Sequence, residues 1–128
     1  FRTSTKNNTI IFYNCASKIK ISRFKKKGII LIKCNLTKNK YFNLKSVLKK
    51  LYNLGCRNLL VEGGDDLTLS FLKKKLFNQF YLFKSQKKIS KLFTYKEFSS
   101  LNELSQKYKN KKLVNTKKGR DIITHYNF

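Results

Sequence analysis

The feature that restricts the fold of this sequence most is a change of pattern in the middle of the chain. A short apolar run, Asn58–Val61, is followed by Gly63 and Gly64, after which apolar residues return at helical spacing. We predict a buried strand over Asn58–Val61 and a helix whose first turn is capped by Asp66. The apolar face of this helix comprises Leu67, Phe71, Leu72 and Leu76.

Similar short apolar runs recur along the chain. Those rich in β-branched or aromatic residues predict strands at Thr9–Tyr13, Gly28–Cys34, Gln79–Phe83 and Asp121–Tyr126. Between the first two, the polar and basic segment Ser17–Lys27 predicts a connection over the surface. Leu36–Phe42 is also polar and predicts a loop.

An amphipathic helix is predicted between Asn43, which can cap its first turn, and Gly55, which can end it. Its apolar face comprises Leu44, Val47, Leu48, Leu51, Tyr52 and Leu54. The region Lys84–Lys112 is ambiguous, but one spacing in it permits a helix, that of Phe98, Leu101, Leu104 and Tyr108. The order of elements predicts one α/β domain over residues 1–128, with crossover helices and a sheet covered on both faces.

The turn between strand and helix is also where chemistry is expected. Without side chains, Gly63 and Gly64 let a ligand approach the backbone, and the helix start offers free amides to a phosphate. Glu62 lies at the strand end, where ligands of open α/β sheets bind. The segment matches neither the G-x-G-x-x-G dinucleotide pattern nor a P-loop. A purely steric role for the two glycines therefore stays open.

The formal net charge of +24, from 30 basic and 6 acidic residues, admits two interpretations. One is a phosphate-rich partner such as RNA or DNA. The other is the codon usage of an AT-rich genome, which over-supplies Lys, Asn, Ile, Phe and Tyr. We favour codon usage, because arginines are few and the lysines are spread along the sequence. A basic nucleic-acid-binding module is kept as the alternative function.

Other chemistry-bearing residues argue against several classes of site. Cys15, Cys34 and Cys56 lack C-x-x-C spacing, so neither a zinc nor a redox site is predicted, and all three are expected to be small buried residues in a reducing cytosol. His125 is the only histidine, and no Ser/His/Asp set is recognisable around it. No metal is expected. No apolar run is long enough to cross a membrane, and no signal peptide is recognised.

One stretch of the chain resembles a known family. Leu54–Gly64, which reads Leu-Gly-Cys-Arg-Asn-Leu-Leu-Val-Glu-Gly-Gly, together with Leu67 and Ser70–Leu72, is similar to the C-terminal reductase domain of the bifunctional riboflavin biosynthesis deaminase/reductase family. The resemblance continues less specifically through Leu76–Phe83 and the closing Gly119–Tyr126. It implies a dihydrofolate-reductase-like fold with a mostly parallel sheet flanked by helices, of which this chain carries the C-terminal part.

The resemblance also implies an activity and a site. The family uses NADPH to reduce the ribosyl group of 5-amino-6-(5-phosphoribosylamino)uracil to the ribityl form in riboflavin biosynthesis. Glu62 is then expected to contact the substrate and Asn14 the cofactor. The cofactor phosphates are expected to be lined by Gly63, Gly64, Asp65, Asp66, Leu67, Thr68, Leu69 and Ser70. A homodimer and a cytoplasmic location are expected on the same ground.

Two departures from the family affect these expectations. Asp65 and Asp66 stand where the family has small or hydroxyl residues, and Asp65 beside a phosphate is repulsive unless it turns to solvent or pairs with a lysine. A reductase-like domain without activity is therefore a third possibility. The chain also has no Met and no counterpart of the family's first reductase strands or its zinc deaminase domain. Phe1 is expected to be an internal position, and the chain alone is expected not to turn over substrate.

Overall fold

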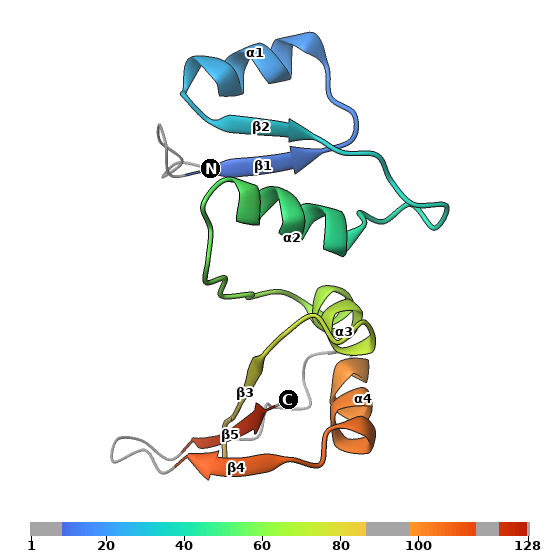
Figure 1. Cartoon of the computed structure of the whole chain (residues 1–128), viewed down its shortest axis with the longest axis vertical. Helices are drawn as coiled ribbons and strands as arrows, with labels where there is room; N and C mark the ends of the chain where they lie inside the picture. The colour runs from blue at the N-terminus through green and yellow to red at the C-terminus, as the bar shows by residue number, and fades with distance from the viewer. Residues whose placement is uncertain (1–8, 87–97, 115–120, 128) are drawn as a thin grey trace, which may run out of the picture. The chain divides into compact units, whose positions relative to one another are not determined.

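A computed structural model describes residues 9–86, 98–114 and 121–127 of the chain. The chain divides into two compact units, Phe1–Leu59 and Leu60–Phe128. Each unit has its own helices and its own sheet (Figure 1). The single domain expected over residues 1–128 stays a prediction.

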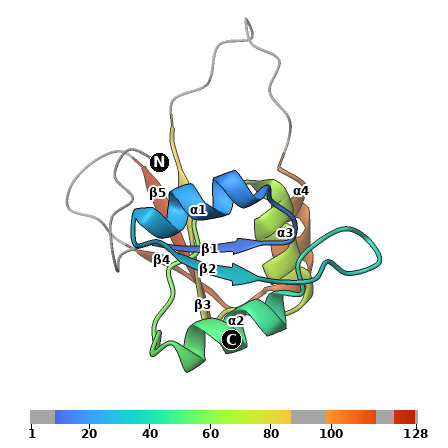
Figure 2. The same cartoon turned by 90° about the horizontal axis from the view of Figure 1, so that it is seen from above.

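The first unit begins with a β–α–β arrangement. β1 (Ile10–Tyr13) and β2 (Ile30–Lys33) pair in parallel. Parallel neighbours need a crossover connection, and α1 (Lys18–Lys26) supplies it (Figure 2). The two strands confirm those predicted at Thr9–Tyr13 and Gly28–Cys34.

The segment predicted as a surface connection, Ser17–Lys27, does join the two strands and is largely exposed, but it forms the helix α1, which was not predicted. The hydroxyl of Ser17 caps the helix by accepting from the amide of Lys20 at 3.3 Å. Ile21 and Phe24 are half-buried, whereas the other residues of the helix are exposed. With exposed Ile19, the helix has three apolar residues, too few to reveal it by their period, and the crossover between parallel strands decides the structure here.

α2 (Leu44–Asn53) confirms the predicted amphipathic helix of the first unit. The side chain of Asn43 accepts from the amide of Ser46 at 3.3 Å, and Gly55 follows the helix with a φ of +90°. Other residues are strained at such an angle, so glycine is the residue suited to end this helix. Leu36–Phe42 is a loop as predicted, and its two ends form an isolated bridge.

The second unit packs two helices against an antiparallel sheet. α3 (Asp65–Lys73) and α4 (Ser99–Lys107) lie side by side (Figure 1). The strands, in the spatial order β3-β5-β4, are β3 (Gln79–Lys84), β5 (Ile122–Asn127) and β4 (Lys111–Val114). β3 and β5 confirm the last two predicted strands, and α4 confirms the helix that the spacing permitted.

The α/β class is thus confirmed, but a parallel arrangement is found in only one pair of the described strands. β1 and β2 are parallel, whereas β5 pairs antiparallel with both of its neighbours. The chain between β4 and β5, residues 115–121, is too short for the crossover that parallel neighbours require. β4 escaped prediction because it begins with Lys111 and Lys112 and all its residues are exposed. Lysines are typical of edge strands, where they discourage pairing with other chains.

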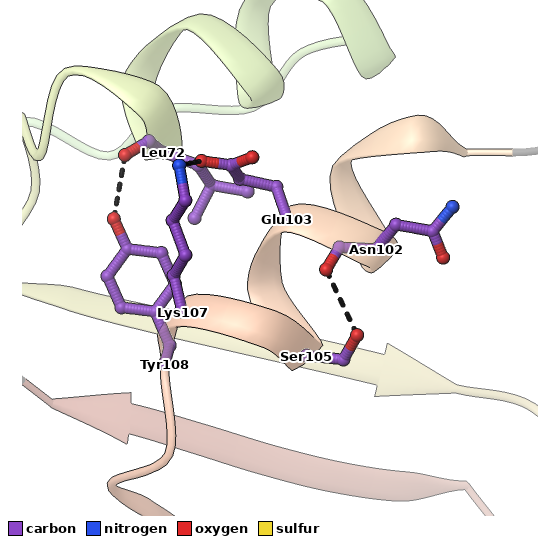
Figure 3. A network of polar contacts seen from close by, with 6 residues as sticks. All are labelled: Leu72, Asn102, Glu103, Ser105, Lys107 and Tyr108. Carbon is purple, nitrogen blue, oxygen red and sulfur yellow. Dashed lines mark hydrogen bonds and ion pairs between the residues drawn. The ribbon is translucent and has the colours of Figure 1, made fainter.

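The core of the second unit joins residues that are far apart in sequence. Leu72 from α3 and Leu104 from α4 are each 1% exposed, and both pack with Tyr108 and Tyr126. The hydroxyl of Tyr108 donates to the carbonyl of Leu72 at 2.7 Å (Figure 3). Partly buried residues around this cluster are Phe77, Phe80 and Leu82. This core holds α3, and with it the turn that precedes α3, against α4 and the sheet.

Predictions around that turn are wrong in three respects. Asn58–Val61 is not a strand, and Leu60 is 82% exposed. An apolar run becomes a strand only where a partner takes up its hydrogen bonds, and among the described residues none does so here. Gly64, and not Asp66, is the N-cap of the helix, which starts earlier than predicted. α3 also ends before Leu76, which lies beyond the last helical turn.

Candidate functional site

The turn at the start of α3 is open to solvent. Glu62, Gly63 and Gly64 are exposed, and Gly64 has an extended backbone with φ −70° and ψ 177°. The amide of Thr68 donates to the carbonyl of Gly64 at 3.1 Å, which starts the hydrogen bonding of the helix. The backbone amides of Asp65, Asp66 and Leu67, in the first turn, have no carbonyl within the helix to which they can donate. The turn therefore presents free donors at the positive end of the helix dipole.

The two glycines of the turn have different surroundings. A Cβ added at Gly63 would lie 2.6 Å from Cδ2 and 3.2 Å from Cβ of Leu67, so a side chain there forces Leu67 to move. A Cβ added at Gly64 would meet nothing within 4 Å. Its φ of −70° is also open to any residue, so neither strain nor crowding in this unit requires glycine there. The steric interpretation thus accounts for Gly63 but leaves Gly64 unexplained.

Asp65 points away from the turn, toward the first turn of α4. One carboxylate oxygen accepts from the amide of Ser99 at 2.9 Å and from its hydroxyl at 2.6 Å. The other oxygen accepts from the amide of Ser100 at 2.8 Å. The hydrogen bonds from Ser100 and Ser99 hold the pKa of the Asp65 carboxyl well below its usual range. The repulsion expected between Asp65 and a phosphate is reduced, because this carboxylate is committed to another helix.

Ser99 and Ser100 were missed as partners of this region. Sequence spacing placed a helix near them, but no local pattern links a helix start to an aspartate more than thirty residues earlier. The contact forms because the core packs α3 beside α4. It was therefore out of reach of an argument from periodicity.

The rest of the predicted cofactor-binding segment offers mainly backbone. Asp66 is exposed, and its carboxylate has no partner among the residues described. The hydroxyl of Ser70 donates to the carbonyl of Asp66 at 2.8 Å, so it is turned back onto its own helix. Leu67 is 37% exposed, while Thr68 and Leu69 are half-buried. Amides and one free acidic side chain are thus what this segment presents.

Glu62 and Asn14 stay predictions as binding residues. Glu62 is exposed beside the turn, and within the described part of the chain nothing binds its carboxylate. Asn14 belongs to the first unit, where it follows β1. Its side-chain amide donates to the carbonyl of Cys34 at 3.0 Å and ties together the ends of the two parallel strands.

The remaining candidate side chains form no recognisable site. The cysteines are free, as expected, but Cys15 is exposed and the other two are half-buried, so the prediction of three buried residues is wrong. Cys15 lies just beyond β1 and outside the packed elements. His125 stacks on Tyr81 with ring centroids 4.4 Å apart. Within the described ranges, no group of three His, Cys, Asp or Glu residues could hold a metal ion. In the same ranges, no helix is long and apolar enough to span a membrane.

Comparison with known proteins bears on the whole of this region. Residues 1–87 match the model of the RibD C-terminal domain family, and this match includes the turn, α3 and Asn14. A protein of Aquifex aeolicus (strain VF5), the riboflavin biosynthesis protein RibD, is 32% identical over 108 residues. The matched region covers 84% of this chain and 28% of that protein, so the chain spans less than a third of its length.

Neither comparison favours the basic nucleic-acid-binding module. The family match covers more than half of the chain, and it holds across both the parallel strand pair and the glycine turn. The chain belongs to the RibD C-terminal domain family.

Proposed function

We propose that this chain provides the cofactor-binding side of an enzyme of riboflavin biosynthesis. The proposed reaction is the reduction of the ribosyl group of 5-amino-6-(5-phosphoribosylamino)uracil to the ribityl form, with NADPH as hydride donor. The observation that supports it is the open turn at Gly64, in a chain of the RibD C-terminal domain family. The turn has free amides and no internal need for its second glycine.

The residues of the turn fit the anionic part of a dinucleotide. The space that a Cβ would occupy at Gly64 is open, so a phosphate can approach the backbone there. The amides of Asp65, Asp66 and Leu67 would bind its oxygens, aided by the helix dipole. When bound, the cofactor supplies the hydride, and the protein supplies binding and orientation.

Charge in and around the turn acts in two directions. Asp66 is exposed in the first turn of α3 and weakens the attraction for a phosphate. The net charge of +24 acts in the opposite sense over a longer range. Both the substrate and the cofactor are anions in this proposal, so their binding should weaken with added salt.

Glu62 is proposed as the substrate contact. Its ionised carboxylate only accepts hydrogen bonds, which suits a substrate rich in hydroxyl and amino donors. The residue is exposed next to the turn and is not used by the packing of the described residues. A carboxylate at this position is therefore available to hold the sugar or the aminopyrimidine beside the cofactor.

Replacing Gly64 by Val in the full-length protein tests this function. The new side chain fills the open space over the amides, so the Kd for NADPH should rise about tenfold, equivalent to about 1.4 kcal/mol. Fluorescence titration with NADPH measures it, and unfolding in urea checks that the variant is folded. Asn78→Val, at an exposed position outside the turn, is the matched control and should leave the Kd unchanged. A folded Gly64→Val variant with wild-type affinity contradicts the proposal, as does a full-length protein that oxidises no NADPH when given the pyrimidine.

The proposal extends to a homodimer in the cytoplasm, on the ground of the family resemblance. Sedimentation of the full-length protein at micromolar concentration should show twice the mass of one chain. A single-chain mass under these conditions would remove the dimer from the proposal.

A further inference from the structure

Asp65 supplies the capping side chain that α4 lacks at its own N-terminus. The N-cap residue of that helix is Phe98, whose apolar side chain cannot accept hydrogen bonds from the free amides of the first turn of α4. The carboxylate of Asp65 binds two of them, those of Ser99 and Ser100, and also the Ser99 hydroxyl. A residue of the first turn of α3 thus serves as the capping side chain of α4. Residues 88–128, which include α4, lie outside the match to the family model, which covers residues 1–87.

We propose that Asp65 is the positioning residue of the cofactor-binding turn, because it ties the first turn of α3 to the first turn of α4. This inference rests on the proposed function. Among the described residues from Glu62 to Asp66, Asp65 is the one whose side chain bonds to another element. The two glycines have no side chains, and Glu62 and Asp66 are exposed without partners there. The direction of the amides at the turn is therefore set through Asp65.

The other end of α3 is held independently. Leu72 is 1% exposed in the core, and its carbonyl accepts from the hydroxyl of Tyr108 at 2.7 Å (Figure 3). The same carbonyl also accepts from the amide of Lys75 at 3.0 Å, so it keeps a partner when the hydroxyl is removed. Asp65 and Tyr108 are thus two links between the same pair of helices, one at each end of α3. Asp65 alone of the two lies next to the turn.

The same contact explains how an acidic residue is tolerated beside a phosphate. The negative charge of Asp65 is placed at the positive end of the α4 dipole and is bound by three donors. The carboxylate faces α4, which leaves the amides of its own helix free. Asp66 has no such arrangement among the described residues, so removing its charge should increase affinity for a phosphate-bearing ligand.

Substitutions should distinguish the hydrogen bonds between Asp65 and α4 from the negative charge of its carboxylate. Asp65→Ala removes the cap, and the misplaced amides should raise the Kd for NADPH about tenfold in the full-length protein. Asp65→Asn removes the charge and keeps one oxygen acceptor, but its NH2 group cannot accept from the second α4 amide, so its Kd should lie between those of the wild type and Asp65→Ala. Ser99→Ala, which removes one donor, should raise the Kd about twofold. In all three variants the KM for the pyrimidine should change less than the KM for NADPH.

Tyr108→Phe is the matched control for a merely structural role. It loosens the same two helices at the other end of α3, so it should lower the urea midpoint while leaving the Kd for NADPH unchanged. Hydrogen exchange at Ser99 and Ser100 should be faster in Asp65→Ala and unchanged in Tyr108→Phe. Suppose that the wild type binds NADPH. The positioning role is then wrong, and the proposed function survives, if the Kd for NADPH is unchanged in both Asp65→Ala and Ser99→Ala. The same conclusion holds if the Kd rises as much in Tyr108→Phe as in Asp65→Ala. If the wild type binds no NADPH, the proposed function is wrong and the positioning role falls with it.

Discussion

The two units of this chain are held together in different ways. Among the described residues, the buried apolar side chains of the second unit are Phe71, Leu72, Leu104, Tyr108 and Tyr126. In the described part of the first unit, residues 9–59, Ile29 alone reaches that degree of burial. The first unit instead shows two capped helices and one pair of parallel strands. The difference indicates that long-range packing stabilises the second unit, where the candidate turn lies.

Charge separates the units as well. Every acidic residue of the chain lies in the second unit, while basic residues occur throughout both. Carboxylates that accept hydrogen bonds in the folded state make the free energy of unfolding depend on pH. The first unit has none, so it offers an internal reference for experiments on the second.

Leu104→Ala should be the most damaging of these changes. The side chain is 1% exposed at the centre of the second unit, so its loss should cost about 2–5 kcal/mol of unfolding free energy. Leu48→Ala on α2 is the matched change in the first unit, where the residue is half-buried, and it should cost about 1 kcal/mol. Urea unfolding, followed by hydrogen exchange in each unit, measures both. Equal losses of unfolding free energy in the two variants would show that the core of the first unit is as well packed as that of the second.

Asn43→Ala should affect the first unit through its cap. The side chain accepts from the amide of Ser46, and losing this bond should weaken α2 by about 1 kcal/mol. Asn53→Ala, at the exposed last residue of the same helix, should have little effect. Exchange rates of the α2 amides report the difference. If they stay unchanged in Asn43→Ala, packing and not capping holds this helix.

Lowering the pH should reduce the stability of the second unit more than that of the first, and this is the smallest of the three expected effects. The pKa of Asp65 is below its ordinary value of 3.8, so the unfolded chain takes up the proton first as the pH falls. The stability that this carboxylate contributes is complete well above 3.8 and is lost as the pH falls from there toward the lower pKa of the folded state. The difference in urea midpoint between the wild type and Asp65→Asn should be smaller at about pH 2.5 than at about pH 6. An equal fall in the midpoint of the first unit would remove the contrast between the units.

Much of the fold could be predicted because its signals are local. The apolar runs of β1, β2, β3 and β5 and the apolar stripe of α2 each fall within a dozen residues. Asn43 and Gly55 mark the ends of α2 by their own chemistry. The glycine turn and its family resemblance were also readable, and the match over residues 1–87 confirms the family.

The errors arise where a neighbour decides the structure. α1 forms as the crossover between parallel strands although few of its residues are apolar. β4 forms although it is rich in lysine, because β5 offers it a free edge. Asn58–Val61 has the composition of a strand and yet pairs with no described strand. In each case hydrogen-bond partners outside the segment outweigh local preference.

For the candidate site, the order of residues alone established that an apolar run, two glycines and a helix follow one another, since this depends on composition within one short stretch. The tertiary structure decided the rest. It showed that a side chain at Gly63 would crowd Leu67 whereas one at Gly64 would meet open space, and that Asp65 caps a distant helix. The reason is that the direction of a side chain depends on what packs beside its element, and a core built from separated segments carries no local signature.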